Sequence, residues 1–357
     1  KDSSSIILMG AYLTNKHQLT DFKDEASILK YDSSGIETRD DIVYGLYGQY
    51  EQKIWGDLQL NAGADINNSD VDKGFFNRGY SGLNYSGYGR LSIPFANNLA
   101  LSGGLRYERL QSNNLLSFGA KLRYKYDNNT QFFVDASLTE NAPNLTNNTD
   151  KGKEQSWLGL VGAQGKFLGV DYNINTFGRI IVSPIYSVLS MDGERILELS
   201  QCDCEETIAA GLNIQTNMNL VSTLNWKTKL QATYTDTDNS TATVNFLPPL
   251  YLYTAIEYTY KIIKSELTGG LSISAVSPFS AMGYYPGKRR YYLSGTQSDF
   301  MYDGLNAYLI VKIGNAFVRI NMDNLLDNGY YYVSMYPNYG RSFKLSFSWT
   351  FSNFHTH

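Results

Sequence analysis

The residues of this sequence with the clearest potential for chemistry are regularly spaced cations. Lys121, Arg123 and Lys125 occupy every second position of one segment, and Arg90 and Arg106 stand in the two segments before it. A spacing of two places side chains on one face of a strand. Cations on the same face of neighbouring strands would form a basic wall that favours anions in a water-filled passage. The alternative is a solvated face on which these cations pair with carboxylates, for which the candidates are Glu108, Asp135, Glu257 and Glu266.

Two further groups of residues extend the candidate binding surface. Three cations near the C-terminus are at strand positions that are predicted to face the same water-filled passage: Lys312, Arg319 and Lys344. One long loop combines aromatic and basic residues, with ligand candidates Tyr284, Tyr285, Lys288, Arg289, Arg290 and Tyr291. Aromatic and basic side chains together suit anionic or sugar-like ligands. Tyrosines are also abundant where a membrane meets water, which is the alternative explanation for this loop.

Residues that could support catalysis or metal binding are sparse. Cys202 and Cys204 provide two thiols, which cannot complete a four-ligand zinc site by themselves, so a local disulfide or free thiols are expected. His17, His355 and His357 form no ligand cluster, and the sequence contains no motif of a hydrolase, metalloprotease or nucleotide-binding enzyme. We therefore predict that the protein is not an enzyme, uses no cofactor and holds no metal. A net charge of -4 gives no footprint for nucleic acid.

The segment at 341–351 shows which kind of element positions the basic residues. Large apolar side chains alternate there with polar ones, and the apolar set is Phe343, Leu345, Phe347, Trp349 and Phe351. This alternation predicts a strand with one apolar and one polar face. A C-terminal strand of this kind is typical of an outer-membrane barrel, where it closes the barrel with lipid outside and water inside.

The same alternation recurs along the chain and predicts a closed antiparallel transmembrane β-barrel of about 16 strands. We expect one barrel domain at 1–354, followed by a C-terminal tail at 355–357. Short turns are predicted at 55–57, 96–98, 127–129, 167–168, 220–222, 263 and 314–315. Long loops are predicted at 14–38, 140–154, 184–204, 277–303 and 325–341. Short periplasmic turns opposite long extracellular loops are typical of such barrels, and no apolar stretch is long enough for a membrane helix.

Bulky side chains at strand positions that are predicted to face the inside of the barrel indicate that the lumen is partly filled. They are Tyr47, Tyr88, Phe133, Phe177, Tyr251, Tyr253, Tyr308 and Phe317. A filled lumen would favour a structural role over the passage of solutes.

Two stretches resemble TonB-dependent outer-membrane receptors. The first, at 321–351, matches the family's C-terminal signature at Asn324, Leu325, Asp327, Tyr330, Gly340, Arg341 and Phe343. The second, at 99–145, resembles the family's mid-barrel arrangement of a G-L-R-Y segment, a hairpin and an A-P-x-L segment. The resemblance implies a barrel in the bacterial outer membrane. Family members also carry an N-terminal plug in a barrel of about 22 strands. Barrel-like features begin here within the first fifty residues, so we expect no plug in this chain. The first residues do not have the pattern of a secretory signal, so we expect that any such signal has already been removed.

Three functions are compatible with these features. The first is porin-like passage of solutes, with a small anionic or sugar-like solute as the expected ligand. The second is a structural or adaptor barrel that assembles with lipoproteins or other outer-membrane subunits. The third is the barrel portion of a receptor for a nutrient or a metal chelate. All three place the protein among outer-membrane lipids.

Overall fold

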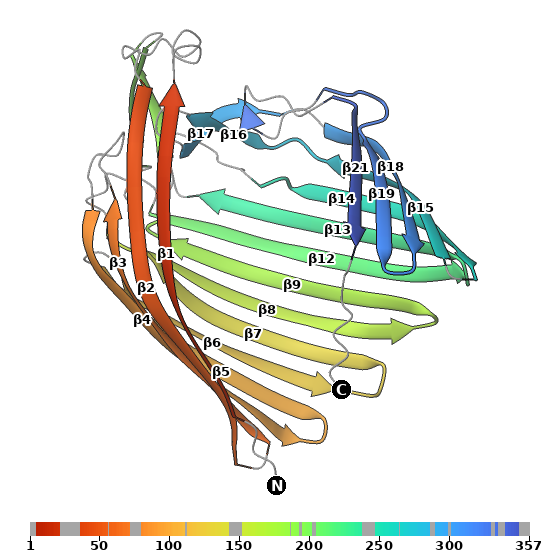
Figure 1. The fold of residues 1–357 in the computed structure, drawn as a ribbon, viewed down its shortest axis with the longest axis horizontal. Helices are drawn as coiled ribbons and strands as arrows, with labels where there is room; N and C mark the ends of the chain where they lie inside the picture. Colours follow the sequence, from red (N-terminus) through yellow and green to blue (C-terminus); the bar gives the residue numbers. More distant parts are fainter. Residues whose placement is uncertain are drawn as a thin grey trace.

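The computed structural model describes most of the chain as strands and turns. It covers residues 5–21, 36–55, 57–71, 80–110, 113–142, 152–185, 187–192, 195–201, 205–237, 247–263, 265–285, 290–298, 301–329, 333–334 and 340–349. Sixteen of the strands form one antiparallel sheet that follows the chain order and curves into a barrel wall (Figure 1). Among the described residues, no helix is long and apolar enough to cross a membrane.

The strands of the large sheet match the predicted series closely. They are β1 (Ser5–Asp21), β2 (Ile36–Trp55), β3 (Leu58–Val71), β4 (Tyr80–Ala96), β5 (Leu99–Leu110), β6 (Asn113–Lys125), β7 (Thr130–Asn141), β8 (Glu154–Phe167), β9 (Val170–Val182), β12 (Glu206–Val221), β13 (Leu224–Thr237), β14 (Leu250–Ile262), β15 (Ser265–Val276), β18 (Met301–Ile313), β19 (Ala316–Asp323) and β21 (Ser342–Trp349). The count of sixteen confirms the prediction.

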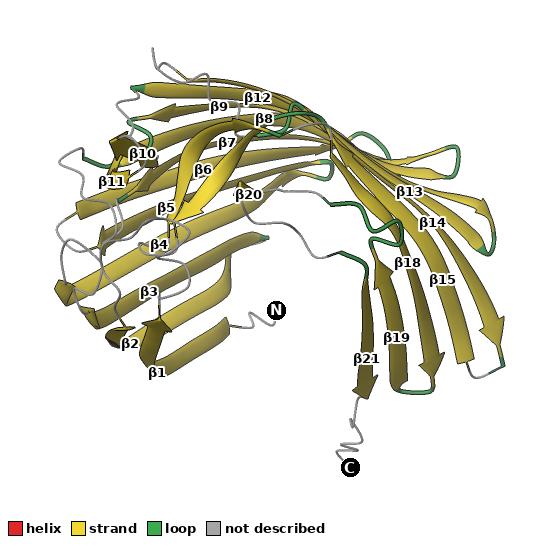
Figure 2. Ribbon diagram, turned by 90° about the horizontal axis from the view of Figure 1, so that it is seen from above, coloured by secondary structure: helices red, strands yellow, loops and turns green. Residues whose placement is uncertain are grey.

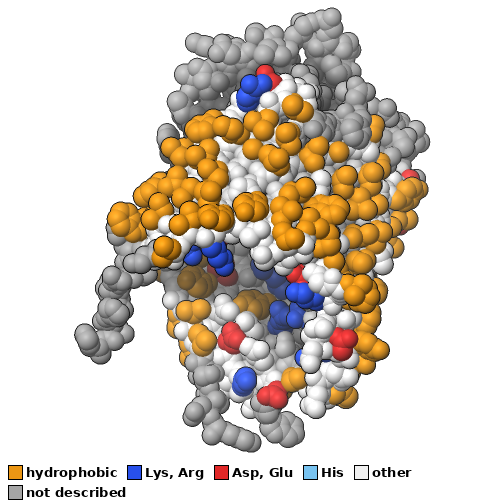
Figure 3. All heavy atoms as spheres, turned by 90° about the vertical axis from the view of Figure 1, so that its right-hand side faces the viewer, with side chains coloured by type: hydrophobic (Ala, Val, Ile, Leu, Met, Phe, Trp, Pro, Cys, Tyr) orange, Lys and Arg blue, Asp and Glu red, His pale blue; other side chains and the backbone are white. Residues whose placement is uncertain are grey.

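The register of the sheet fixes which side chains share a face. We define the inner face as the positions that lie on the same side as Lys121, and the outer face as those on the same side as Leu122. Large apolar side chains on the outer face are exposed, and Leu345 and Phe347 each keep 65% of their surface. Hydrophobic side chains cover much of the outside, while Lys and Arg side chains are visible within the opening (Figure 3). The predicted division between an apolar outer face and a polar inner face is confirmed.

Seven short turns join consecutive strands at one end of the sheet, and at the opposite end β5 and β6 are also separated by only two residues. All seven predicted short turns are present, and each connects two consecutive antiparallel strands. Between β8 and β9, both Leu168 and Gly169 have positive φ angles, of 49° and 82°. Two residues with positive φ form the turn that matches the twist of a tight hairpin. This end of the sheet therefore has the compact connections expected on the periplasmic side.

The long connections contain more structure than predicted. The segments at 184–204 and 277–303 were predicted as loops, but they hold the strands β10 (Ser187–Asp192), β11 (Arg195–Gln201), β16 (Ser280–Tyr285) and β17 (Arg290–Gln297). With β20 (Val333–Ser334) they form a five-stranded sheet in the order β11-β10-β17-β16-β20. Its parallel pairs join segments from three different connections. The loop predicted at 14–38 is also shorter, because β1 and β2 extend into it.

The five-stranded sheet lies at the long-loop end of the barrel wall (Figure 1) and over its hollow when seen from above (Figure 2). The same view shows the sixteen strands as an arc with β1 and β21 at its two ends. The pairings among the described residues do not include one between β1 and β21. The barrel architecture is thus evident from the strand order, the curvature and the alternating faces.

The C-terminal motif residues hold the connection between β19 and β21. Asn324 is 2% exposed and has a φ of 51°. Its side chain donates to the carbonyl of Asn328 at 2.8 Å and accepts from the Asn328 amide at 3.0 Å, while its backbone amide donates to Asn306 at 2.7 Å. The Asp327 carboxylate accepts from the backbone amide of Arg341 at 2.7 Å. These bonds set the direction in which the chain enters its last described strand.

Candidate lumen site

The five predicted wall cations lie on three neighbouring strands of the inner face. Arg90 is on β4, Arg106 is on β5, and Lys121, Arg123 and Lys125 are on β6. Alternation alone accounts for this arrangement, because each strand places every second residue inward. The pairing of β4, β5 and β6 brings these residues onto one continuous surface.

Two of the five cations have carboxylate partners. The Lys121 ammonium lies 2.6 Å from the Asp135 carboxylate, and the Arg106 guanidinium lies 2.9 Å from the Glu108 carboxylate. In the described part of the chain, no ion pair or hydrogen bond engages the side chains of the other three cations: Arg90, Arg123 and Lys125. All three are exposed. Cations therefore remain in excess on this part of the inner face.

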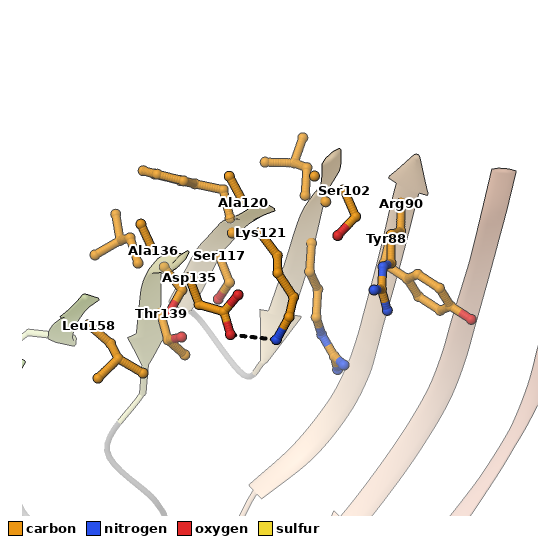
Figure 4. Close-up of a pocket in the computed structure, with 18 of the residues that line it drawn as sticks. Tyr88, Arg90, Ser102, Ser117, Ala120, Lys121, Asp135, Ala136, Thr139 and Leu158 are labelled. Atoms are coloured by element: carbon orange, nitrogen blue, oxygen red, sulfur yellow. Dashed lines mark hydrogen bonds and ion pairs between the residues drawn. The ribbon is translucent and has the colours of Figure 1, made fainter. Parts of the chain in front are cut away.

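Hydroxyl groups lie beside Arg90, Arg106 and Lys121 along a hollow that extends over β4 to β8. Figure 4 shows Arg90, Lys121 and Asp135 extending to one side of the strands, and Ala120 and Ala136 to the other. The polar lining includes Tyr88, Ser102, Ser117, Ser137 and Thr139. Hydroxyl donors beside cations are suited to hydrogen bonding with the oxygens of an anion.

The cations near the last strand are more fully engaged. Lys344 lies 2.7 Å from the Asp323 carboxylate. Lys312 lies 5.5 Å from the ring centre of Phe317, and Arg319 lies 5.8 Å from that of Tyr308. Arg319 also donates to Asn321 at 2.9 Å. This second group has fewer unoccupied donors for a solute than the wall on β4 to β6.

Glu257 and Glu266, the other two candidate partners of the inner-face cations, differ in their contacts. Glu257 lies 2.5 Å from Lys227 and accepts a short hydrogen bond from Tyr308. Glu266 is directly opposite Lys312 in the sheet, yet no ion pair joins these two residues within the described structure. The inner face is thus partly cross-paired, and the pairing is incomplete at the predicted wall.

The loop candidates are only partly described. The backbones of Tyr284 and Tyr291 are paired between β16 and β17, as are those of Tyr285 and Arg290. Three further groups lie outside the described residues: Lys288 and Arg289 of the same loop, the thiols Cys202 and Cys204, and Phe351 of the last strand. Among the residues that the structure describes, no three His, Cys, Asp or Glu side chains are grouped to hold a metal ion.

Inward aromatic side chains lie against glycines of the neighbouring strand. Five such pairs are directly opposite each other in the sheet: Tyr47 with Gly10, Tyr88 with Gly63, Phe133 with Gly162, Phe177 with Gly211, and Tyr308 with Gly270. A Cβ atom at Gly63 would stand 2.5 Å from the Tyr88 ring. Each ring therefore occupies the space that a side chain would fill. The aromatic residues cover the wall, and their number does not by itself indicate a filled lumen.

Sequence reasoning missed these pairs and the hydroxyl lining, although a signal for the pairs was present. On each strand, the alternating pattern places these glycines at inward-facing positions. It places the aromatic residues of the neighbouring strands at inward-facing positions as well. The register between strands is needed to bring the two together, and alternation within a strand does not provide it.

The comparisons with known proteins agree with this geometry. The structure is similar to the FrpB iron transporter of Neisseria meningitidis, with a TM-score of 0.71, 10% sequence identity, and coverage of 95% of this chain and 59% of that one. A variant of the ferric enterobactin receptor PfeA of Pseudomonas aeruginosa gives a TM-score of 0.70 at 14% identity, with coverage of 97% and 59%. The copper transporter OprC gives 0.67 at 14% identity, with coverage of 89% and 58%.

These proteins have TonB-dependent receptor barrels, so the resemblance noted in the sequence is confirmed at the level of the fold. The chain spans about three-fifths of the length of the structures it matches. No protein-family model matches the sequence, and a search of curated proteins finds no match.

Proposed function

We propose that this chain forms the wall of a bacterial outer-membrane barrel that admits small anionic solutes along its inner face. The apolar outer face supports the membrane location, because lipid-facing strands must present apolar side chains and satisfy their backbone groups within the sheet. The fold supports the same location, since the similar structures are transporters and receptors. The roles of these similar proteins as transporters and receptors also favour a non-enzymatic function.

One observation carries the preference for anions. Arg90, Arg123 and Lys125 are exposed on the inner face, and no carboxylate within the described residues neutralises them. Exposed cations along a passage raise the local concentration of anions. Arg106 and Lys121 add less to this preference, because each is already paired with a carboxylate.

A receptor role for the same wall is the second candidate. The similar structures are named as transporters or receptors of iron, copper and ferric chelates. In that case the basic wall would line the route of a bound anionic complex. The structural or adaptor role has less support, because the inward aromatic rings lie on wall glycines.

Replacing Arg90, Arg123 and Lys125 together by Gln should move the zero-current potential toward cation preference. The measurement is made on the reconstituted protein in planar bilayers across a salt gradient. The effect should be larger at low salt, where screening extends over about 30 Å instead of about 10 Å.

The matched control replaces Lys312, Arg319 and Lys344 by Gln, since these cations already contact rings or a carboxylate. We expect a smaller shift in the control. An unchanged potential in the first variant, in a conducting pore, would contradict the basic wall. Absence of any conductance in the unmodified protein would favour the structural role.

A further inference from the structure

We infer that a group of carboxamide side chains on the inner face forms a binding site for the hydroxyl groups of an oligosaccharide. This carboxamide patch comes from the neighbouring strands β7, β8, β9 and β12 (Figure 1) and consists of Gln131, Gln164, Asn173, Asn175, Asn213 and Gln215. The site rests on the proposed function, because solutes must reach the inner face. It uses other residues than the basic wall, however, and it does not depend on the charge of the solute.

The register of the sheet aligns four of these side chains in one row on the inner face. Gln131 lies directly opposite Gln164, which lies opposite Asn173. Asn173 is in turn opposite Gln215. Neighbouring strands are about 4.8 Å apart, so the row extends over about 14 Å. A row of this length suits a linear solute that contacts several strands at once, such as a short oligosaccharide.

Hydrogen bonds between the carboxamides orient them. The Asn213 side chain donates to Asn175 at 3.0 Å, and Asn175 donates to Asn173 at 3.4 Å. Gln164 donates to Gln131 at 3.0 Å. A carboxamide has two N–H donors and an oxygen that can accept two hydrogen bonds. These bonds therefore leave each carboxamide with capacity to bind a ligand.

Part of the patch is exposed. Gln164 and Gln215 are exposed, and the other members are half-buried. Within the described residues, no hydrogen bond engages the Gln215 side chain. A hollow of about 450 Å³ is lined by Gln131, Gln164 and Asn173 together with the turn at 127–129. Cavities that bind small molecules typically have volumes of about 300 to 1,000 Å³, so this hollow is large enough for a sugar ring.

The chemistry of the patch differs from that of the basic wall. Lys125 and Lys229 lie directly beyond the two ends of the row, and the row between them carries no charge. Lys166, beside the patch on β8, lies 3.9 Å from the Asp171 carboxylate. Carboxamides both donate and accept hydrogen bonds, as hydroxyl groups do, whereas an ionised carboxylate only accepts. The patch is therefore better suited to a polyhydroxylated solute than to a small anion.

An aromatic ring borders the patch. Phe133 has inner register and lies two positions after Gln131 on β7. A Cβ atom added at Gly162 would lie 2.5 Å from the Phe133 ring and 2.8 Å from the Cβ atom of Asn175, so the ring lies close to the patch. Aromatic rings offer an apolar surface against which the C–H groups of a sugar can pack. The Lys121 ammonium lies 5.5 Å from the centre of the same ring, so the patch adjoins the basic wall.

The test measures the binding of maltohexaose, a neutral linear oligosaccharide, to the purified protein by equilibrium dialysis. The detergent must have no sugar headgroup, so that it does not compete for the site. We expect saturable binding by the unmodified protein. Gln215→Leu should weaken it about threefold, and Gln164→Leu together with Gln215→Leu about tenfold, because each replacement removes one net hydrogen-bond contribution.

The matched control is Gln49→Leu on β2, which makes the same replacement on the inner face outside the patch. It should leave the binding of maltohexaose unchanged. Gln215→Leu removes no hydrogen bond within the described structure, so it should fold. If the double variant does not fold, the comparison of Gln215→Leu with Gln49→Leu decides the outcome.

Three results would overturn the inference: no saturable binding of the sugar to a folded barrel, equal weakening by Gln215→Leu and Gln49→Leu, or binding of a neutral Gly-Ser peptide in place of the sugar. The zero-current potential measures the proposed anion preference separately. A barrel that prefers anions and does not bind the sugar would contradict only the carboxamide patch. A barrel that binds the sugar without preferring anions would contradict only the basic wall.

Discussion

Alanine in place of Gly162 is expected to destabilise the barrel by about 1 to 3 kcal/mol, because the added methyl group has no room. A Cβ atom at this position of β8 would lie 2.5 Å from the Phe133 ring. It would also lie 2.7 Å from the backbone oxygen of Ile174 and 2.8 Å from the Cβ atom of Asn175. The ring can move, but the backbone of β9 is held by its own pairing. Unfolding by urea in the presence of detergent or lipid measures the loss.

The matched control is Gly159→Ala on the same strand, since no atom lies within 4 Å of a Cβ atom there. It should leave stability nearly unchanged. At Gly63 the three nearest atoms to an added Cβ atom all belong to the Tyr88 ring. The double replacement Gly63→Ala with Tyr88→Ala should therefore remove the clash, whereas adding Phe133→Ala to Gly162→Ala should give only partial relief. Equal losses from Gly159→Ala and Gly162→Ala would contradict the packing argument.

The barrel wall could be predicted from sequence because its signal is local. Each strand alternates between polar and apolar residues, as in the run from Leu58 to Ile66, and this alternation alone assigns both strand and face. The short turns could also be predicted from neighbouring residues alone. A turn of two or three residues fixes where the strand before it ends and where the strand after it begins. The spacing of two therefore predicts that Lys121 and Arg123 share one face, and the register of β6 places them on one face.

The features that could not be predicted depend on which strands meet. The pairing of Lys121 with Asp135, and the contact of Phe133 with Gly162, follow from the registers of β6 with β7 and of β7 with β8. The five-stranded sheet depends on parallel pairing between connections that are distant in the sequence. Alternation within one segment does not predict such pairing. One part of it did carry a local signal. Asp192 and Gly193 separate two short apolar segments, which is a hairpin pattern.

Leu345→Arg should destabilise the barrel by about 2 to 4 kcal/mol if this position of β21 lies near the bilayer midplane. Leu345 has outer register and is 65% exposed, and its neighbours on the same face are Phe343 and Phe347. Arginine there would place a charge in hydrocarbon, with an apolar residue, Ile320, directly opposite on β19. The free energy of unfolding in lipid vesicles is the quantity to measure.

The adjacent replacement Lys344→Leu provides the comparison, because position 344 is on the inner face and Lys344 lies 2.7 Å from Asp323. Both partners are partly exposed, so loss of this ion pair should cost about 1 kcal/mol or less. The two variants alter neighbouring residues of one strand and differ mainly in the face that receives the change. If Lys344→Leu were the more damaging of the two, the apolar face would be directed toward the lumen. The basic wall on β4 to β6 would then face lipid, which its exposed cations make energetically unfavourable.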